Sequence, residues 1–147
     1  MFDDVQTFFA EVGEAGCYAL CLCSVAEEYM QRSDRTFQLD VLRAIKKGVD
    51  NHCIHYNYND KNDNDNMWVS CPETFLYYLT GKHWSVTKVD ASYTVKSDKE
   101  FLIDRYERVK TGATIGHFER KNFIPYKNSL TVQYGKLVSR RLCKVND

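Results

Sequence analysis

The spacing of apolar residues changes once along this 147-residue chain, near Thr111. Before that point apolar residues mostly recur every three or four positions, which predicts helices. After it, β-forming residues alternate with polar ones, which predicts strands. Two segments, 49–58 and 83–89, interrupt the helical part with extended character. An α+β fold is typical of chains in which helices come first and an antiparallel sheet comes last.

The individual elements follow from caps, breakers and apolar stripes. Two predicted helices cover residues 17–32 and 36–47. A third, short helix begins at a capping box at 70–73 and ends at Gly81. A fourth begins at a second capping box at 97–100 and runs through Val109. The predicted strands cover 113–120, 130–133 and 136–145, and the last two flank a turn at 134–135. Helix 17–32 is apolar on its flanks as well as on its stripe, so we expect it to be central and mostly buried. Gly48 is expected to end the second helix.

Length and charge restrict the class of protein. At 147 residues the chain is close to one domain, so we expect a single domain over 1–147. A domain of this size buries about 70% of its unfolded surface and needs no metal or disulfide to form a core. Twenty basic residues balance twenty acidic ones, which leaves no overall positive field for nucleic acid or an anionic membrane. We therefore expect a peptide or protein partner, and neither nucleic acid nor membrane.

The six cysteines raise the question of disulfides. They lie at Cys17, Cys21, Cys23, Cys53, Cys71 and Cys143. No positively charged segment of a secretory signal precedes them, since the first basic residue is Arg32. No stretch reaches the 18 or more apolar residues that are typical of a membrane span. We therefore expect a cytoplasmic protein with reduced thiols, most of them packed as small buried residues.

One cysteine occupies a distinctive position. Cys17 follows Gly16 at the first turn of the predicted buried helix, where unpaired backbone N–H groups and the positive helix end stabilise a thiolate. A nucleophilic cysteine also needs a base, and His117 in the predicted strand 113–120 is the best placed of the four histidines. Gly116 beside it leaves room for an approaching group. The same two residues also fit ordinary roles, as a core cysteine and a structural histidine, and both interpretations stay open at this point.

The motifs around these two residues carry a resemblance. Gly16-Cys17-Tyr18 opens a long central helix, and Gly116-His117-Phe118 lies in a late strand that precedes a predicted hairpin. In these features the chain resembles the papain-like cysteine peptidase superfamily, over roughly residues 13 to 146. The closest likeness is to the bacteriocin-processing branch, and the chain is also similar to an uncharacterised phage- and prophage-associated family with that fold. The resemblance implies a Cys-bearing central helix packed on a C-terminal antiparallel sheet, with Cys17 as nucleophile and His117 as base.

Two features of that superfamily do not transfer cleanly. Its members usually place an Asp or Asn on the strand after the histidine, often before a proline, but Ile124 precedes Pro125 in this chain. Asn122 and Asn128 are nearby substitutes, and Asn128 is the predicted third site residue. The glutamine that contributes to the oxyanion hole in the superfamily is not evident, because Gln6 lies eleven residues before the cysteine.

Other signals in the sequence are weaker. His52, Cys53, His55 and Cys71 are residue types that bind zinc, but their spacing matches none of the common structural sites. The polar segment 59–66 lacks the glycine and glutamate that an EF-hand requires, so we expect a solvated loop there. The C-terminal strand carries Lys136, Arg140, Arg141 and Lys144. Alternation divides these charges between two faces, which favours a solvated edge strand over a nucleic-acid site.

Two functional hypotheses follow. The first is a cysteine hydrolase that cleaves a peptide or other amide bond through Cys17 and His117, without cofactor or metal. The second is a catalytically inactive papain-like fold that serves as a protein-binding module of phage or prophage origin. The missing acidic residue before Pro125 motivates the second hypothesis.

Overall fold

A computed structural model describes residues 16–56, 67–110, 112–120 and 135–146 of the chain. Helices and strands occur in the order α2 (Cys17–Gln31), α3 (Val41–Asp50), β1 (Ile54–Tyr56), β2 (Met67–Val69), α4 (Pro72–Thr80), β3 (Trp84–Asp90), β4 (Glu100–Lys110), β5 (Ala113–Glu119) and β6 (Lys136–Val145). The fold belongs to the α+β class, as the sequence predicted. No helix in these described ranges is long and apolar enough to cross a bilayer.

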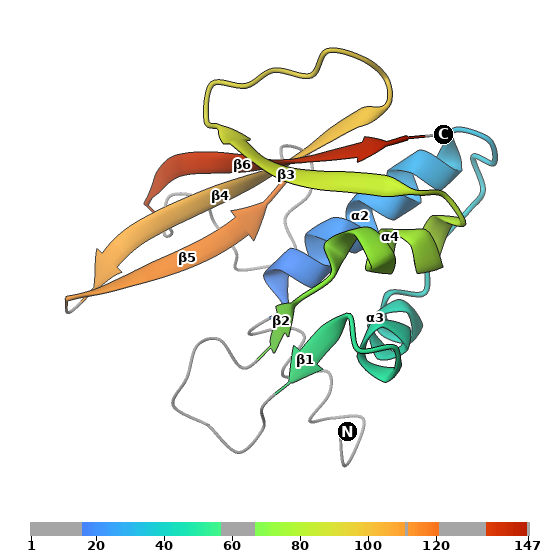
Figure 1. The fold of residues 1–147 in the computed structure, drawn as a ribbon, viewed down its shortest axis with the longest axis horizontal. Helices are drawn as coiled ribbons and strands as arrows, with labels where there is room; N and C mark the ends of the chain where they lie inside the picture. The colour runs from blue at the N-terminus through green and yellow to red at the C-terminus, as the bar shows by residue number, and fades with distance from the viewer. Residues whose placement is uncertain (1–15, 57–66, 111, 121–134, 147) are drawn as a thin grey trace.

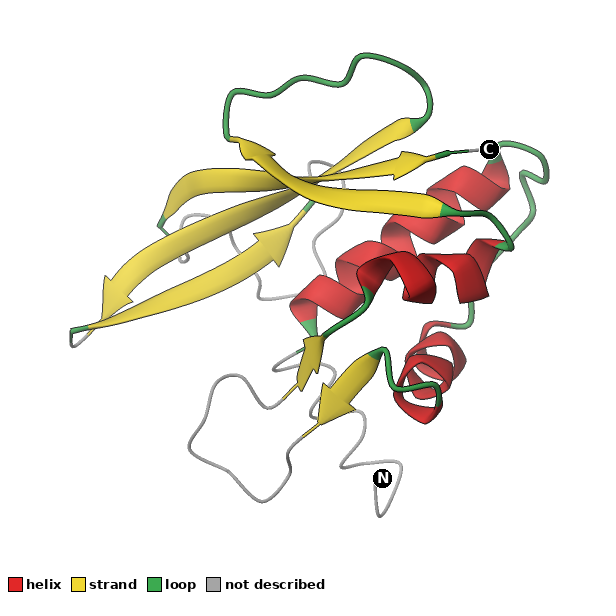
Figure 2. Ribbon diagram, in the orientation of Figure 1, coloured by secondary structure: helices red, strands yellow, loops and turns green. Residues whose placement is uncertain are grey.

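Two antiparallel sheets organise the strands (Figures 1 and 2). A small one pairs β1 with β2, and the main one has the strand order β3-β6-β4-β5. Strands β4 and β5 form a long hairpin that projects away from the helices in Figure 1. The sheet order leaves β3 and β5 as edge strands and places β6 between β3 and β4.

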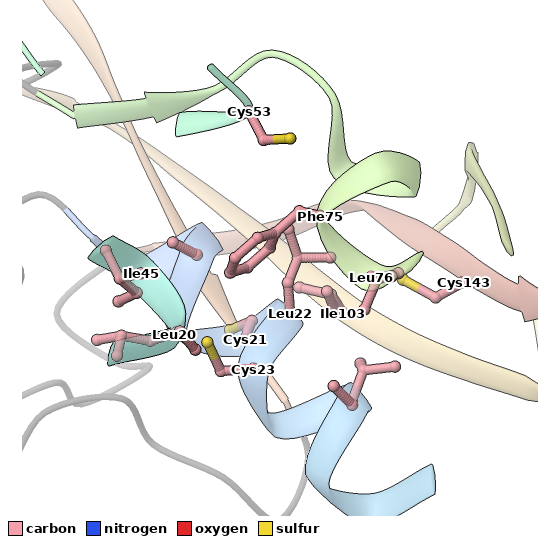
Figure 3. Packing of buried hydrophobic residues seen from close by; sticks show 14 of the residues in the cluster. Leu20, Cys21, Leu22, Cys23, Ile45, Cys53, Phe75, Leu76, Ile103 and Cys143 are labelled. Carbon is pink, nitrogen blue, oxygen red and sulfur yellow. The ribbon is translucent and has the colours of Figure 1, made fainter. Parts of the chain in front are cut away.

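The core forms where α2 and α4 pack against one face of the main sheet (Figure 3). Seven residues of α2 are buried, namely Ala19, Leu20, Cys21, Leu22, Cys23, Val25 and Ala26. They meet Phe75 and Leu76 of α4 and Ile103 of β4, all with 0% exposure. Burying each large apolar side chain contributes about 1.5–3 kcal/mol, so this contact dominates the stability of the domain. The prediction of a central, mostly buried helix over 17–32 is confirmed.

The cysteines are free, as expected, in a structure that describes all six of them. Cys21, Cys23, Cys53 and Cys143 are buried and Cys71 is exposed, while Cys17 is half-buried. Four of the six therefore pack as small core residues. Burial raises the pKa of the Cys143 thiol to about 12.

Helix α3 begins later and ends later than predicted. Asp40 caps it, because its side chain accepts a hydrogen bond from the backbone N–H of Arg43 at 3.2 Å. The prediction that Gly48 ends this helix is wrong, since the helix continues to Asp50. Gly48 serves packing instead: an added Cβ would lie 2.6 Å from Cδ1 of Ile54 and 2.9 Å from the ring of Phe75.

The predicted capping box before α4 does not form. The N-cap position is Cys71, with no side-chain cap, and Pro72 begins the helix. The Ser70 hydroxyl instead lies 2.7 Å from Nε2 of His55, which ties β1 to the segment after β2. The predicted stop is confirmed, because Gly81 adopts a left-handed conformation with φ of 74°.

The predicted helix from the 97–100 capping box is wrong, because β4 occupies Glu100–Lys110. The segment has period-two burial at its start, where Phe101 and Ile103 face the core. The Glu100 carboxylate accepts hydrogen bonds from the Tyr93 hydroxyl and the Lys96 N–H, so it holds the preceding loop rather than a helix end. Strand β4 pairs with β5 on one side and β6 on the other, and this pairing outweighs the local preference of the sequence for a helix.

The C-terminal strand matches the predicted range but not the predicted environment. Strand β6 is hydrogen-bonded on both sides, so it is not the solvated edge that its charges suggested. Its charges do divide between faces as predicted: Arg140 pairs with Asp104 at 2.9 Å, and Arg141 lies over the ring of Phe118. The predicted strand 130–133, the loop 59–66 and Asn128 lie outside the described residues.

We predict that Gly48→Ala destabilises the domain although alanine favours helices over glycine by about 1 kcal/mol. The new Cβ would meet Ile54 and Phe75, and overpacking of this kind costs about 1–3 kcal/mol. Urea denaturation of Gly48→Ala, Ile54→Val and the double variant measures the effect. Because Ile54→Val removes the Cδ1 atom, Gly48→Ala should cost less in that background. Equal costs in both backgrounds would contradict the packing explanation.

We also predict that the buried thiols make the domain sensitive to alkali. The Cys143 pKa is about 12 in the folded state against 9.0 ordinarily, so the unfolded chain loses this proton first as the pH rises. Stability is therefore complete below pH 9 and falls above it, by about 2 kcal/mol at pH 10.5 for this thiol. Urea denaturation at pH 7.5 and 10.5 tests this, and Cys143→Ala should reduce the difference by that amount. An unchanged difference in the variant would refute the assignment.

Candidate functional site

Cys17 is the first residue of α2. Gly16 before it has no side chain that could cap the helix, so the first-turn N–H groups have no side-chain partner at the N-cap. Hydrogen bonding from the backbone of Phe118, Tyr18 and Cys17 itself lowers the pKa of the thiol. Such a set of donors can hold a negative charge on sulfur or on a nearby oxygen.

Burial is nevertheless the largest influence on this thiol. It raises the pKa of Cys17 above the ordinary value, while the backbone hydrogen bonds and the charge of Arg105 lower it without compensating fully. The expectation that the helix start lowers the pKa of this cysteine is therefore wrong for the folded chain, because desolvation outweighs the N–H donors. At neutral pH the residue is a thiol that needs a base to react.

Packing of α2 against β5 brings the two candidate segments together. Tyr18, the residue after Cys17, stacks on the ring of Phe118, the residue after His117. The first turn of α2 therefore lies against the part of β5 that carries the imidazole.

His117 is buried, with 3% exposure, and its Nε2 lies 3.2 Å from Oε1 of the equally buried Glu119. Burial lowers the pKa of His117, and the hydrogen bond and charge of Glu119 oppose that effect. The imidazole is consequently neutral at pH 7, which is the state of a general base. The contact of Glu119 with Nε2 holds the orientation of the ring.

The two candidate side chains approach β5 from different directions. Phe118 stacks on Tyr18 of α2 with ring centroids 4.4 Å apart, and Arg120 donates to Ser24 of the same helix. Because successive side chains of a strand alternate, His117 and Glu119 leave β5 on the face away from α2. The stacking of Tyr18 on Phe118 therefore brings the start of α2 to the residue after the imidazole, on the opposite face of the strand.

Gly116 leaves room, as predicted, but the group that uses the room is Arg105. A Cβ at Gly116 would collide with the guanidinium of Arg105, which also lies 4.9 Å from the centre of the Phe118 ring. Arg105 is therefore held against these two residues of β5, and its charge lowers the pKa of Cys17. The sequence offered no reason to single out this arginine.

The third site residue differs from the sequence prediction in what can be described. Asn128 lies outside the described residues, whereas Glu119 contacts the imidazole directly. Sequence reasoning missed Glu119 because it looked for an orienting residue on the following strand. The available signal was the i, i+2 spacing of His117 and Glu119, which places both on one face of a strand.

The zinc-type residues around β1 make other contacts. His55 stacks on Trp68 and reaches Ser70, and the Cys53 thiol donates to the backbone oxygen of Asn51. Within the described ranges no three His, Cys, Asp or Glu side chains come close enough together to hold a metal ion.

Comparisons with known proteins found no relative. No protein-family model, no curated protein and no solved structure matches the chain. The function must therefore be argued from the geometry of the site.

We predict that His117 titrates below 6.5 and that Glu119→Gln lowers its pKa further, because the variant removes the charge that opposes burial. Proton NMR of the imidazole C–H signals, assigned with His117→Asn, measures both values. The unfolded chain binds this proton more readily, so stability should also fall as the pH drops below 6.5. A midpoint at or above 6.5 in the native chain would contradict the role of burial.

Proposed function

We propose that the chain is a papain-like cysteine hydrolase that cleaves a peptide or other amide bond, with Cys17 as nucleophile and His117 as base. The observation that carries the proposal is the stacking of Tyr18 on Phe118, with ring centroids 4.4 Å apart, because each ring belongs to the residue that follows one of the two candidate groups. The hydrogen bond between His117 and Glu119 adds a carboxylate that selects the tautomer of the base.

The chemistry follows from the two neutral groups. His117 takes the proton of Cys17 as the sulfur attacks the carbonyl carbon, so a stable thiolate is not required beforehand. Backbone N–H groups at the start of α2 hold the oxyanion of the tetrahedral intermediate. The imidazolium then gives its proton to the leaving amine as the C–N bond breaks. Water hydrolyses the thioester by the reverse sequence and restores the thiol.

A second candidate is a catalytically inactive fold that binds another protein, of phage or prophage origin as the sequence resemblance implies. Two observations favour it: burial raises the Cys17 pKa, and His117 leaves β5 on the face away from α2. Under both candidates the six free thiols agree with a reducing compartment, and we propose a cytoplasmic location.

The test combines thiol labelling with peptide cleavage. We predict that purified protein cleaves members of a synthetic peptide library, read by mass spectrometry, and that Cys17→Ala abolishes cleavage. His117→Ala should reduce the rate by about 10²–10⁴-fold, the usual contribution of a general base. Glu119→Gln should cost at least about tenfold, because the tautomer is less well fixed.

The matched control is Cys71→Ala, which removes an exposed thiol and should leave cleavage unchanged. Iodoacetamide labelling of Cys17 should also slow in His117→Ala and not in His55→Ala. If no peptide is cleaved and Cys17 reacts at the same rate in both histidine variants, the hydrolase is refuted and the binding module remains.

A further inference from the structure

Two arginines converge on one aromatic ring beside Cys17. The guanidinium carbon of Arg105, on β4, lies 4.9 Å from the centre of the Phe118 ring, and that of Arg141, on β6, lies 5.5 Å from it. Phe118 is the cross-strand partner of Arg105, and its ring stacks on Tyr18 of α2. The arginines therefore share the face of the sheet on which α2 lies.

The charges of this cluster do not balance. Arg105 pairs with Glu107, with Nε 3.1 Å from Oε2. Arg141 donates to the hydroxyl of Ser139 at 3.1 Å, and no carboxylate among the described residues lies within ion-pair distance of it. Burial lowers the pKa of Arg141 most, Arg105 lowers it further, and Tyr18 and Glu107 oppose these effects. Among the described residues the two arginines therefore share one nearby carboxylate, Glu107, and a bound anion would neutralise the remaining positive charge.

The two arginines lie close to the start of α2. Both guanidiniums approach the ring of Phe118, which stacks on Tyr18, the residue after Cys17. Arg105 also fills the space over Gly116, and its charge lowers the pKa of Cys17. A planar guanidinium pairs best with a carboxylate, through two parallel hydrogen bonds.

We propose that Arg105 and Arg141 form a specificity site for a carboxylate on the substrate, next to the amide bond that Cys17 attacks. This inference rests on the proposed hydrolase function and names its substrate class: peptides with an acidic side chain or a free carboxylate near the cleaved bond. Glu107 holds Arg105 in place, and Arg141 supplies the charge that the substrate neutralises.

The experiment compares two alkylating reagents of similar size, iodoacetate and iodoacetamide, which differ in a carboxylate. In both reactions the sulfur forms a bond to carbon and iodide leaves with the electrons of the C–I bond. Mass spectrometry gives the rate ratio, iodoacetate over iodoacetamide, separately at Cys17 and at the exposed Cys71. We expect the ratio at Cys17 to exceed that at Cys71 by about tenfold at low salt, since opposite charges attract strongly in a half-buried site.

Variants assign the effect to the two arginines. Arg105→Gln and Arg141→Gln should each lower the ratio at Cys17, Arg105→Lys should retain most of it, and Arg43→Gln, an exposed arginine on α3, should leave it unchanged. If the glutamine variants unfold, the wild-type ratio must still fall towards that of Cys71 in 1 M salt, where charges are screened. Equal ratios at the two cysteines, or no response to salt, would overturn the proposal.

The result separates this inference from the hydrolase proposal. A high ratio at Cys17 without peptide cleavage would support the carboxylate site and count against hydrolysis. Cleavage of neutral and acidic peptides at equal rates, with equal labelling ratios, would overturn the carboxylate site alone.

Discussion

The burial of α2 is the constraint on which the rest of the structure depends. This helix contacts α3, α4, β2, β4 and β5, and its buried residues are small or aliphatic because protein surrounds most of its circumference. The main sheet can close over it only from one side, which leaves the helix start at the edge of β5. The position of Cys17 is therefore a consequence of core packing. The same packing removes water from the thiol, so the fold that brings the residue to β5 also makes it harder to ionise.

The face of the main sheet away from α2 carries charged side chains. Asp104 and Glu119 are direct cross-strand partners, so two carboxylates face each other where water is largely excluded. Each has its own compensating group: Arg140 pairs with Asp104, and His117 with Glu119. Burial raises the pKa of Asp104 and Arg140 opposes it, which shows that the ion pair does not fully offset desolvation. The histidine is thereby part of a polar layer that specifies the register of β4 and β5.

The sequence predicted the features that depend on local chemistry. Helix α2, the left-handed stop at Gly81 and the ranges of β3, β5 and β6 follow from apolar spacing and from glycine. The predictions from sequence failed where residues distant in the chain determine the local structure. Ser97 and Glu100 have the spacing of a helix cap, but the segment after them is paired with two strands. Arg105 was missed for a related reason, since only the pairing of β4 with β5 brings it to Gly116 and Phe118. Glu119 was missed although its spacing from His117 on one strand was visible in the sequence.

The position of β6 has a consequence for how the domain assembles. Strand β3 and strand β4 are not neighbours in the sheet, because β6 lies between them and pairs with both. During synthesis β3 and β4 emerge well before β6, and neither has its central partner until that strand arrives. Loop-closure entropy over such separations makes this step slow. Strand β3 therefore joins the main sheet only after β6, the last of its strands, has been made.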